Sequence, residues 1–159
     1  MADLQTPSRT TEDVQFGQLS GSLGFLLRLS QLQSFADFYT GMGDLNVRPG
    51  EISVLMLIAQ NPGVRQGVLA RALMIKRAHM TKMIRAMEDA DIVSRTVPAD
   101  DRRSIELWLT DKGRARLDAM QEPFIAHESR NTSGLSDAEE AQLKSLLRKY
   151  LGLDAPKDL

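Results

Sequence analysis

The sequence around Met74 constrains the fold of this chain more than any other part of it. Residues 66–73 have the apolar spacing of a short helix, and residues 78–90 have the spacing of a second one. The second pattern places its methionines and Ile84 on one side and its basic residues on the opposite side. Two short helices separated by a tight break, the second of them basic on its exposed side, predict a helix-turn-helix.

A β-hairpin is predicted directly after these two helices. Residues 92–97 form the pattern of one strand, and residues 104–109 form that of another, in which apolar and polar positions alternate. The turn between them carries Arg102 and Arg103 close to its tip. A helix-turn-helix followed at once by such a hairpin is a winged helix, so we expect a winged-helix domain over residues 47–110.

The charge of the chain is concentrated on this segment. The formal net charge of −1, taken alone, offers no support for a nucleic-acid partner. Nine basic and five acidic residues within 65–103 leave +4 on that stretch and −5 on the remainder. Lys76 to Arg85 holds four basic residues and no acidic one. Charge alone favours the interpretation that these residues form a solvated helix face. Because they lie in a predicted helix-turn-helix, the interpretation as a phosphate-binding surface is favoured instead.

Winged-helix geometry suggests which part of duplex DNA each basic side chain would meet. The exposed side of the second helix would enter the major groove, where side chains meet base edges. Arg102 or Arg103 would lie near the minor groove, whose negative potential favours a guanidinium. Phosphate contacts would come from Lys76, Arg95 and helix N-termini. The major-groove candidates are Arg77, His79, Thr81, Lys82 and Arg85.

Apolar helices flank the winged segment on both sides. Residues 15–39 have helical spacing with apolar residues on more than one face, so the helix must bury more than one face. In a chain this short, the second face is expected to meet another subunit. Thr110 is placed to cap a helix after the wing, and a capping box at Ser136 opens the last helix. The residues that this last helix is expected to bury are Leu143, Leu146, Leu147 and Tyr150.

Several function classes are excluded by what the sequence lacks. The chain has no cysteine, which excludes a disulfide framework, a thiolate zinc site and a thiol-based switch. His79 and His127 are its only histidines, and neither has the spacing of a metal site. No nucleophile–base pair or glycine-rich phosphate loop is evident, so we expect neither an enzyme nor a cofactor. Without a signal segment at residues 1–12 or an apolar run of roughly 18 residues, we expect a cytoplasmic location.

Three motifs lie in the segment from Gln66 to Gly113: Gln66-x-x-Leu69-Ala70, Met80-Thr81-x-Met83-Ile84-x-x-Met87-Glu88 and Asp101-Arg102-Arg103-Ser104-x-x-Leu107-x-Leu109-Thr110-x-x-Gly113. In these residues the segment resembles the MarR (multiple antibiotic resistance regulator) family of bacterial transcription factors. At two positions the sequence departs from the family. Met74 and Asp91 stand where the family often has glycine, and Asp is the better suited to left-handed backbone geometry. The turn at Met74 is therefore expected to be tighter or differently packed.

The resemblance implies a homodimer whose first and last helices interleave with those of the partner and whose two winged domains read a palindromic operator. Such proteins usually act as repressors that a small aromatic or lipophilic ligand releases from DNA. Asp101 would pair with Arg102 or Arg103 and orient it, which makes it a further candidate at the DNA interface. The first helix also resembles those of regulators of aromatic-acid catabolism, including some that sense hydroxycinnamoyl-CoA thioesters.

The effector would generally lie between the dimerisation helices and the winged domain. The apolar candidates are expected to be core residues first and pocket residues second. Arg28 would either pair with an acidic residue or bind an anionic effector, and Trp108 would either cover a neighbouring helix or line the pocket. His127 is expected to be buried and hydrogen-bonded or at the dimer contact, with ligand binding as the alternative. The candidate effector-binding residues are Phe25, Arg28, Leu29, Leu32, Met56, Trp108, Phe124 and His127.

The predicted fold is therefore mainly α with a small β-hairpin wing: a winged helix-turn-helix flanked by N- and C-terminal dimerisation helices. The expected function is that of a homodimeric, ligand-released repressor. The alternative is a winged helix that binds another protein without specific DNA binding, which the basic cluster argues against. The predicted organisation is a flexible arm (1–13), an N-terminal dimerisation helix (14–46), the winged-helix domain (47–110), C-terminal dimerisation helices (111–152) and a tail (153–159).

Overall fold

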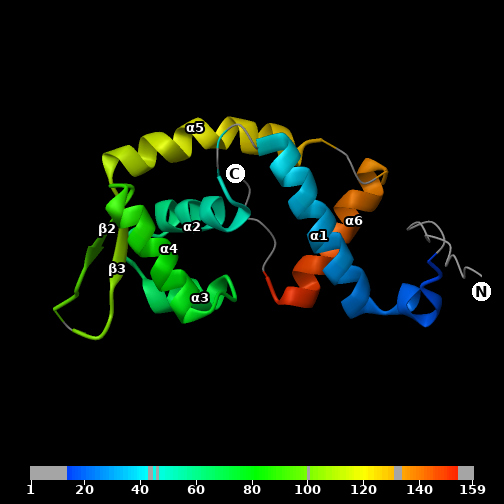
Figure 1. Cartoon of the computed structure of the whole chain (residues 1–159), viewed down its shortest axis with the longest axis horizontal. Coiled ribbons are helices and arrows are strands. Elements are labelled where there is room, and N and C mark those ends of the chain that lie inside the picture. The colour runs from blue at the N-terminus through cyan, green and yellow to red at the C-terminus, as the bar shows by residue number, and fades with distance from the viewer. Residues whose placement is uncertain (1–13, 43–44, 46, 100, 131–133, 154–159) are drawn as a thin grey trace, which may run out of the picture. The chain divides into compact units, whose positions relative to one another are not determined.

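The structure is a computed structural model that describes residues 14–42, 45, 47–99, 101–130 and 134–153. The predicted arm and most of the predicted tail lie outside these residues. The predicted fold class is confirmed, because helices dominate and a small antiparallel sheet forms the wing (Figure 1). In chain order the elements are the 3₁₀ helix η2 (Gly17–Gly21), α1 (Leu23–Met42), α2 (Pro49–Gln60), β1 (Val64–Arg65), α3 (Gln66–Ala72), α4 (Arg77–Asp89), β2 (Val93–Thr96), β3 (Glu106–Leu109), α5 (Asp111–Glu128) and α6 (Asp137–Leu151).

By its internal contacts the chain divides into two compact units, residues 1–37 and 38–159, with the boundary inside α1. In the first unit, the helix expected from residue 15 begins only at Leu23. Gly17 has a φ of +53°, and Ser22 is extended with a ψ of 114°, so the chain forms a short 3₁₀ turn before the α-helix starts. Glycine lowers helix propensity, which explains why apolar spacing alone misplaced the start. The exposed apolar residues of this unit include Phe16, Leu19, Leu23, Leu26, Leu32 and Phe35.

The second unit is built around α2. Pro49 occupies the first turn of this helix, where its missing N–H is not needed, and Glu51 lies in the same turn. α2 packs against α5 and β3, and an ion pair of 3.2 Å joins Glu51 to Arg116 of α5. The central helix is therefore enclosed on several sides, as its apolar sequence requires. Its buried side chains are Ile52, Val54, Leu55 and Ile58.

The helix-turn-helix has the predicted arrangement. α4 buries Met80, Ile84 and Met87 and leaves its basic side exposed. The two positions where glycine was expected both adopt left-handed geometry, with φ values of +52° at Met74 and +57° at Asp91. Met74 therefore adopts the backbone geometry that is usual for glycine.

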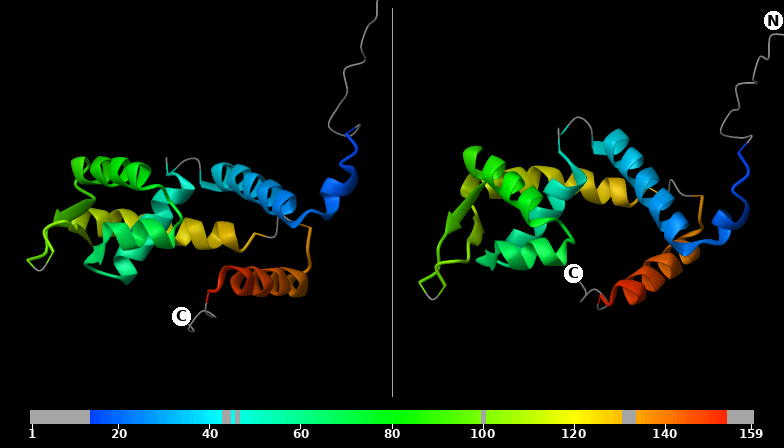
Figure 2. Two further views of the ribbon diagram at one scale, coloured as in Figure 1. Left: turned by 90° about the horizontal axis from the view of Figure 1, so that it is seen from below. Right: turned by 60° about the horizontal axis from the view of Figure 1, so that its bottom comes forward.

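The predicted hairpin is part of a three-stranded antiparallel sheet in the order β1-β3-β2. The two-residue strand β1 pairs with β3 through Val64 and Leu107, and it was too short to be seen in the sequence pattern. The loop between β2 and β3 projects away from the helices of this unit (Figure 2). Leu107 is fully buried and its neighbour Trp108 is exposed, so the predicted faces of this strand are correct.

The last two helices begin at the predicted caps. The Thr110 hydroxyl accepts a hydrogen bond from the Gly113 N–H, and Ser136 forms a capping box with Glu139. The expected burial on α6 is wrong for the single chain, since Leu146 is 56% exposed and Tyr150 is 63% exposed. The amphipathic pattern identified an apolar face correctly, but the described residues leave that face exposed.

Candidate nucleic-acid interface

The exposed side of α4 presents the basic residues that the sequence assigned to the major groove. Arg77, His79, Lys82 and Arg85 are all exposed, and Lys76 occupies the N-cap position just before them. The opposite side of the helix is locked in the core by three fully or nearly buried side chains. The helix therefore has one orientation available, which fixes the direction of the basic side.

Thr81 lies on the same helix but is half-buried, and its hydroxyl is hydrogen-bonded to Gln66. Gln66, the first residue of α3, donates a hydrogen bond of 3.1 Å from Nε2 to the Thr81 hydroxyl. The Gln66 backbone N–H donates to the carbonyl oxygen of Ile105 at 2.8 Å, just before β3. Gln66 thus joins α3, α4 and the wing. Its Oε1 atom is buried and has no hydrogen-bond partner within the part of the chain that the structure describes.

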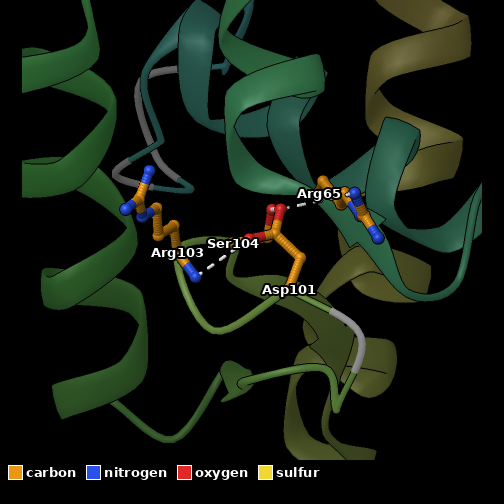
Figure 3. Close-up of polar contacts among 4 residues, drawn as sticks. All are labelled: Arg65, Asp101, Arg103 and Ser104. Carbon is orange, nitrogen blue, oxygen red and sulfur yellow. Dashed lines mark hydrogen bonds and ion pairs between the residues drawn. The ribbon is translucent and has the colours of Figure 1, made fainter.

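Asp101 organises the loop of the wing (Figure 3). Its carboxylate accepts hydrogen bonds from the Ser104 hydroxyl at 2.5 Å and from the Arg103 backbone N–H at 3.0 Å. The same carboxylate forms an ion pair of 3.6 Å with Arg65. These hydrogen bonds, from Ser104 first and Arg103 next, together with the nearby guanidinium, hold the pKa of Asp101 below its usual value. Asp101 therefore stays ionised at neutral pH, and its carboxylate holds the backbone of Arg103 and the side chain of Ser104 in place.

The expected pairing of Asp101 with a wing arginine is wrong in one respect. The carboxylate binds the backbone of Arg103, but its ion pair is with Arg65 from the neighbouring strand β1. The Arg103 side chain points away from the carboxylate (Figure 3). Both Arg102 and Arg103 are exposed, so both guanidinium groups are accessible to solvent.

A hollow of about 380 Å³ lies between α3, α4 and the base of the wing. Four arginines from different elements line it, together with the amide of Gln66 and the hydroxyl of Thr81. Sequence reasoning had selected Arg77, Thr81 and Arg103 but missed the contributions of β1 and α3. Those residues lie outside the basic helix, and only the tertiary fold brings them beside it. The lining arginines are Arg65, Arg71, Arg77 and Arg103.

Arg95 has an internal partner. It forms an ion pair with Glu88, which links β2 to the end of α4, and its Nε atom is buried without a hydrogen-bond partner among the described residues. Arg95 was a candidate for a phosphate contact. Its ion pair with Glu88 also holds strand β2 of the wing against α4.

The effector candidates are spread over both units. Phe25, Leu29, Arg28 and Leu32 lie on the first part of α1, and Arg28 is exposed without an ion pair among the described residues. Met56 on α2 and Phe124 on α5 pack against the core of the second unit.

His127 and Trp108 have partners within the second unit. The rings of His127 and Phe38 form a T-shaped pair with centroids 5.8 Å apart, and the His127 ring lies against Gly41. The contacts that the structure shows for Trp108 are with loop and strand residues. This side chain lies over Gly63 and donates a hydrogen bond of 3.1 Å to the Thr96 hydroxyl.

The described part of the chain holds no cluster of three or more metal-ligating side chains. It also contains no helix with the length and apolarity needed to cross a membrane. The side chains of the interface offer guanidinium, ammonium, amide and hydroxyl donors, which suit the phosphates and base edges of DNA.

Known proteins match the chain over the same segment and beyond it. The model of the MarR family matches residues 47–105. A protein of Thauera aromatica, described as a transcriptional regulatory protein for the hcr operon, is 31% identical over 140 residues, which are 87% of this chain and 84% of that protein.

Two solved structures of the transcriptional repressor CouR also match. One is bound to a 23-mer DNA duplex, with a TM-score of 0.78, 36% identity, and coverage of 87% of this chain and 98% of that one. The other is bound to p-coumaroyl-CoA, with a TM-score of 0.76, 34% identity, and coverage of 87% and 97%.

These matches extend well outside the winged segment, so they include the flanking helices as well as the basic face. They confirm the resemblance found in the motifs, and because family members are transcriptional regulators, they also confirm the expectation that the protein is not an enzyme. The chain belongs to the MarR family, and it is a DNA-binding regulator of transcription.

Proposed function

We propose that the chain acts as a homodimeric repressor whose two winged domains bind the halves of a palindromic operator, and that a small aromatic ligand releases it. The observation that carries the DNA-binding part is the arginine-lined hollow between α4 and the wing. It supports a specific docking geometry, because a flat basic surface would attract phosphates without orienting the protein.

The docking geometry follows from the shape of the duplex. A helix in the major groove and a wing in the adjacent minor groove straddle the sugar–phosphate strand that separates the two grooves. The hollow lies between α4 and the wing, where this strand would run. Arg71, Arg77 and Arg103 would bind its phosphates. Lys76, at the N-cap of α4, would supply a further phosphate contact. The base edges of the major groove would then face His79, Thr81, Lys82 and Arg85.

The dimer accounts for apolar surface that a single chain leaves in water. On α6 an apolar face is exposed, and η2 with the first part of α1 exposes another. Apolar surface of this extent on helices marks an interface, and a second copy of this chain is the partner that the family implies. The exposed residues of α6 include Leu143, Leu146, Tyr150 and Leu151.

Replacing Leu146 with lysine is expected to convert the dimer to monomers. The residue is 56% exposed in the single chain, so the change costs the monomer little, whereas it buries a charge in the dimer. Sedimentation velocity at micromolar concentration measures the result. Ser145→Lys is the matched control, because Ser145 is exposed on the polar side of α6, away from the apolar face that Leu143, Leu146 and Tyr150 form. A Leu146→Lys protein that remains dimeric would exclude α6 from the interface.

The proposed effector is a hydroxycinnamoyl-CoA thioester or a related aromatic acyl-CoA. Its support is the repressor CouR, which binds p-coumaroyl-CoA and is 34% identical to this chain over nearly its whole length. Release would be a shift of population, in which the effector prefers dimers whose α4 helices do not match the operator spacing. Arg28 is available for an anionic group of the effector. The other candidates for the effector site are Phe25, Leu29, Leu32, Met56, Phe124 and His127.

The proposed function is tested by a titration of fluorescent duplex with purified protein. The probe is a duplex selected by the protein from a randomised pool, and its affinity should fall steeply between 50 and 200 mM salt, by about a thousandfold for six or more phosphate contacts. Adding p-coumaroyl-CoA should then dissociate the complex and raise the melting temperature of the free protein. A ligand at 100 times its Kd adds about 2.7 kcal/mol to the free energy of unfolding.

Free CoA and p-coumaric acid are the controls for the effector, since neither alone combines an aromatic acyl group with the CoA moiety. Weak binding to duplex DNA that does not change with salt would support the alternative, a winged helix that binds proteins. Strong DNA binding that is insensitive to p-coumaroyl-CoA would remove the effector from the proposal and leave the operator binding in place.

A further inference from the structure

The turn before α4 contains a strained backbone position. α3 ends in a Schellman motif, in which Ile75 N–H donates to the Ala70 carbonyl at 2.9 Å and Met74 N–H donates to the Arg71 carbonyl at 3.1 Å. The residue at the left-handed position of this motif is Met74, with a φ of +52°. Glycine is the usual residue there, because a side chain raises the energy of left-handed backbone.

The same motif ends two other helices of this chain, and neither uses a bulky apolar residue. At the end of α6 the left-handed residue is Gly152, with a φ of +66°. At the end of α4 it is Asp91, with a φ of +57°, and Ile92 N–H donates to the Met87 carbonyl at 2.8 Å. Aspartate tolerates left-handed geometry better than most residues. Methionine at the third site is therefore the least favourable choice for the backbone.

Packing does not explain this methionine. Its side chain is 78% exposed, which makes it the most exposed large apolar side chain among the described residues. The folded chain thus gains almost no burial from Met74 and carries the strain of its backbone. Strained positions that the fold does not need occur mainly at functional sites.

The place of Met74 in the fold indicates what it would contact. It lies two residues before Lys76, the N-cap of α4, and three before Arg77. The N-terminal part of such a helix is the part that reaches base edges in the major groove. The apolar group that a base edge offers there is the thymine methyl.

From this we infer that Met74 contacts a thymine methyl group at the edge of each operator half-site and so determines sequence preference. The inference rests on the proposed binding of DNA by α4. Met74 would then contribute to the recognition of the DNA sequence, because its exposed, flexible thioether side chain can pack on a methyl group without needing a fixed hydrogen-bond geometry.

The test compares three variants with the wild type. Met74→Gly removes the side chain and the strain, Met74→Gln keeps the length but not the apolar character, and Asp91→Gly is the matched control at the same position of another Schellman motif. Each protein selects its preferred duplex from one randomised pool. The affinity of each is then measured on the wild-type sequence, with single thymines replaced by deoxyuridine, which lacks the methyl group.

We expect the wild type and Asp91→Gly to select the same sequence, whereas both Met74 variants lose one thymine preference per half-site. Deoxyuridine at that position should weaken wild-type binding about fourfold per half-site, the value of one buried methyl group, and should not weaken the Met74 variants further. Met74→Gly should also melt a few degrees above the wild type, and by more than Asp91→Gly, because it relieves the greater strain.

The inference is overturned if Met74→Gly melts higher but selects the same thymines, or if deoxyuridine weakens the wild type and the Met74 variants equally. A wild-type protein that selects no sequence at all would instead contradict the proposed function. The two failures are therefore distinguishable in one experiment.

Discussion

Gly113→Ala is expected to lower the free energy of unfolding by about 3 kcal/mol or more, the upper part of the range for overpacked sites. A Cβ atom at Gly113 would lie 2.0 Å from the Ile92 carbonyl oxygen and 2.9 Å from its carbonyl carbon. Both are backbone atoms, and the oxygen already accepts a hydrogen bond from Thr110 N–H at 3.1 Å. Relief requires α5 to move away from the start of β2, which would break the cap of α5. Urea denaturation at one fixed protein concentration measures the loss.

Gly50→Ala is the control for this prediction. Gly50 also lies in the first turn of a helix, but the nearest atom to its added Cβ would be Met83 Cε at 3.7 Å, an ordinary van der Waals contact. We expect this variant to be as stable as the wild type or slightly more stable, because alanine has the higher helix propensity. Equal stability of the two variants would show that the junction of β2 and α5 is more plastic than its geometry indicates.

The parts of this fold that the sequence predicted are those that local rules govern. The α4 pattern put Met80, Ile84 and Met87 inside, and the structure buries all three. The capping box at Ser136 and the Thr110 cap start their helices where expected, since each depends on residues three apart. Alternation along the second wing strand gave the correct buried face for the same reason.

What the sequence did not predict depends on contacts between distant segments. Strand β1 has two residues and therefore no period, and it exists because β3 offers it a partner. Arg65 reaches Asp101 only through that pairing, so the carboxylate was assigned to the wrong guanidinium. Gln66 belonged to a recognised motif, but its bond to Thr81 crosses from one helix to the next. The apolar face of α6 was predicted, whereas its exposure among the described residues could be seen only in the structure.

Arg102 and Arg103 are expected to contribute to DNA binding in different ways, although the sequence could not separate them. Arg103 lines the hollow that would hold the phosphate strand, whereas Arg102 is exposed on the loop and does not line it. We therefore assign Arg102 to the minor groove. Arg102→Ala should weaken binding by about 1–3 kcal/mol per copy and relax the preference for A·T pairs beneath the wing. Affinities for duplexes with A·T or G·C pairs at those positions measure both effects.

Arg103→Ala should behave as the loss of a phosphate contact. It should weaken binding to all duplexes alike and reduce the slope of log affinity against log salt concentration by about one per copy. Arg71→Ala should have the same effects, because Arg71 lines the same hollow. Arg114→Ala, on an exposed position of α5, controls for the loss of one positive charge. If Arg103→Ala relaxed the A·T preference and Arg102→Ala changed only the salt slope, the two assignments would have to be exchanged. Arg103, and with it the hollow, would then face the minor groove, because an arginine senses the width of that groove only by entering it.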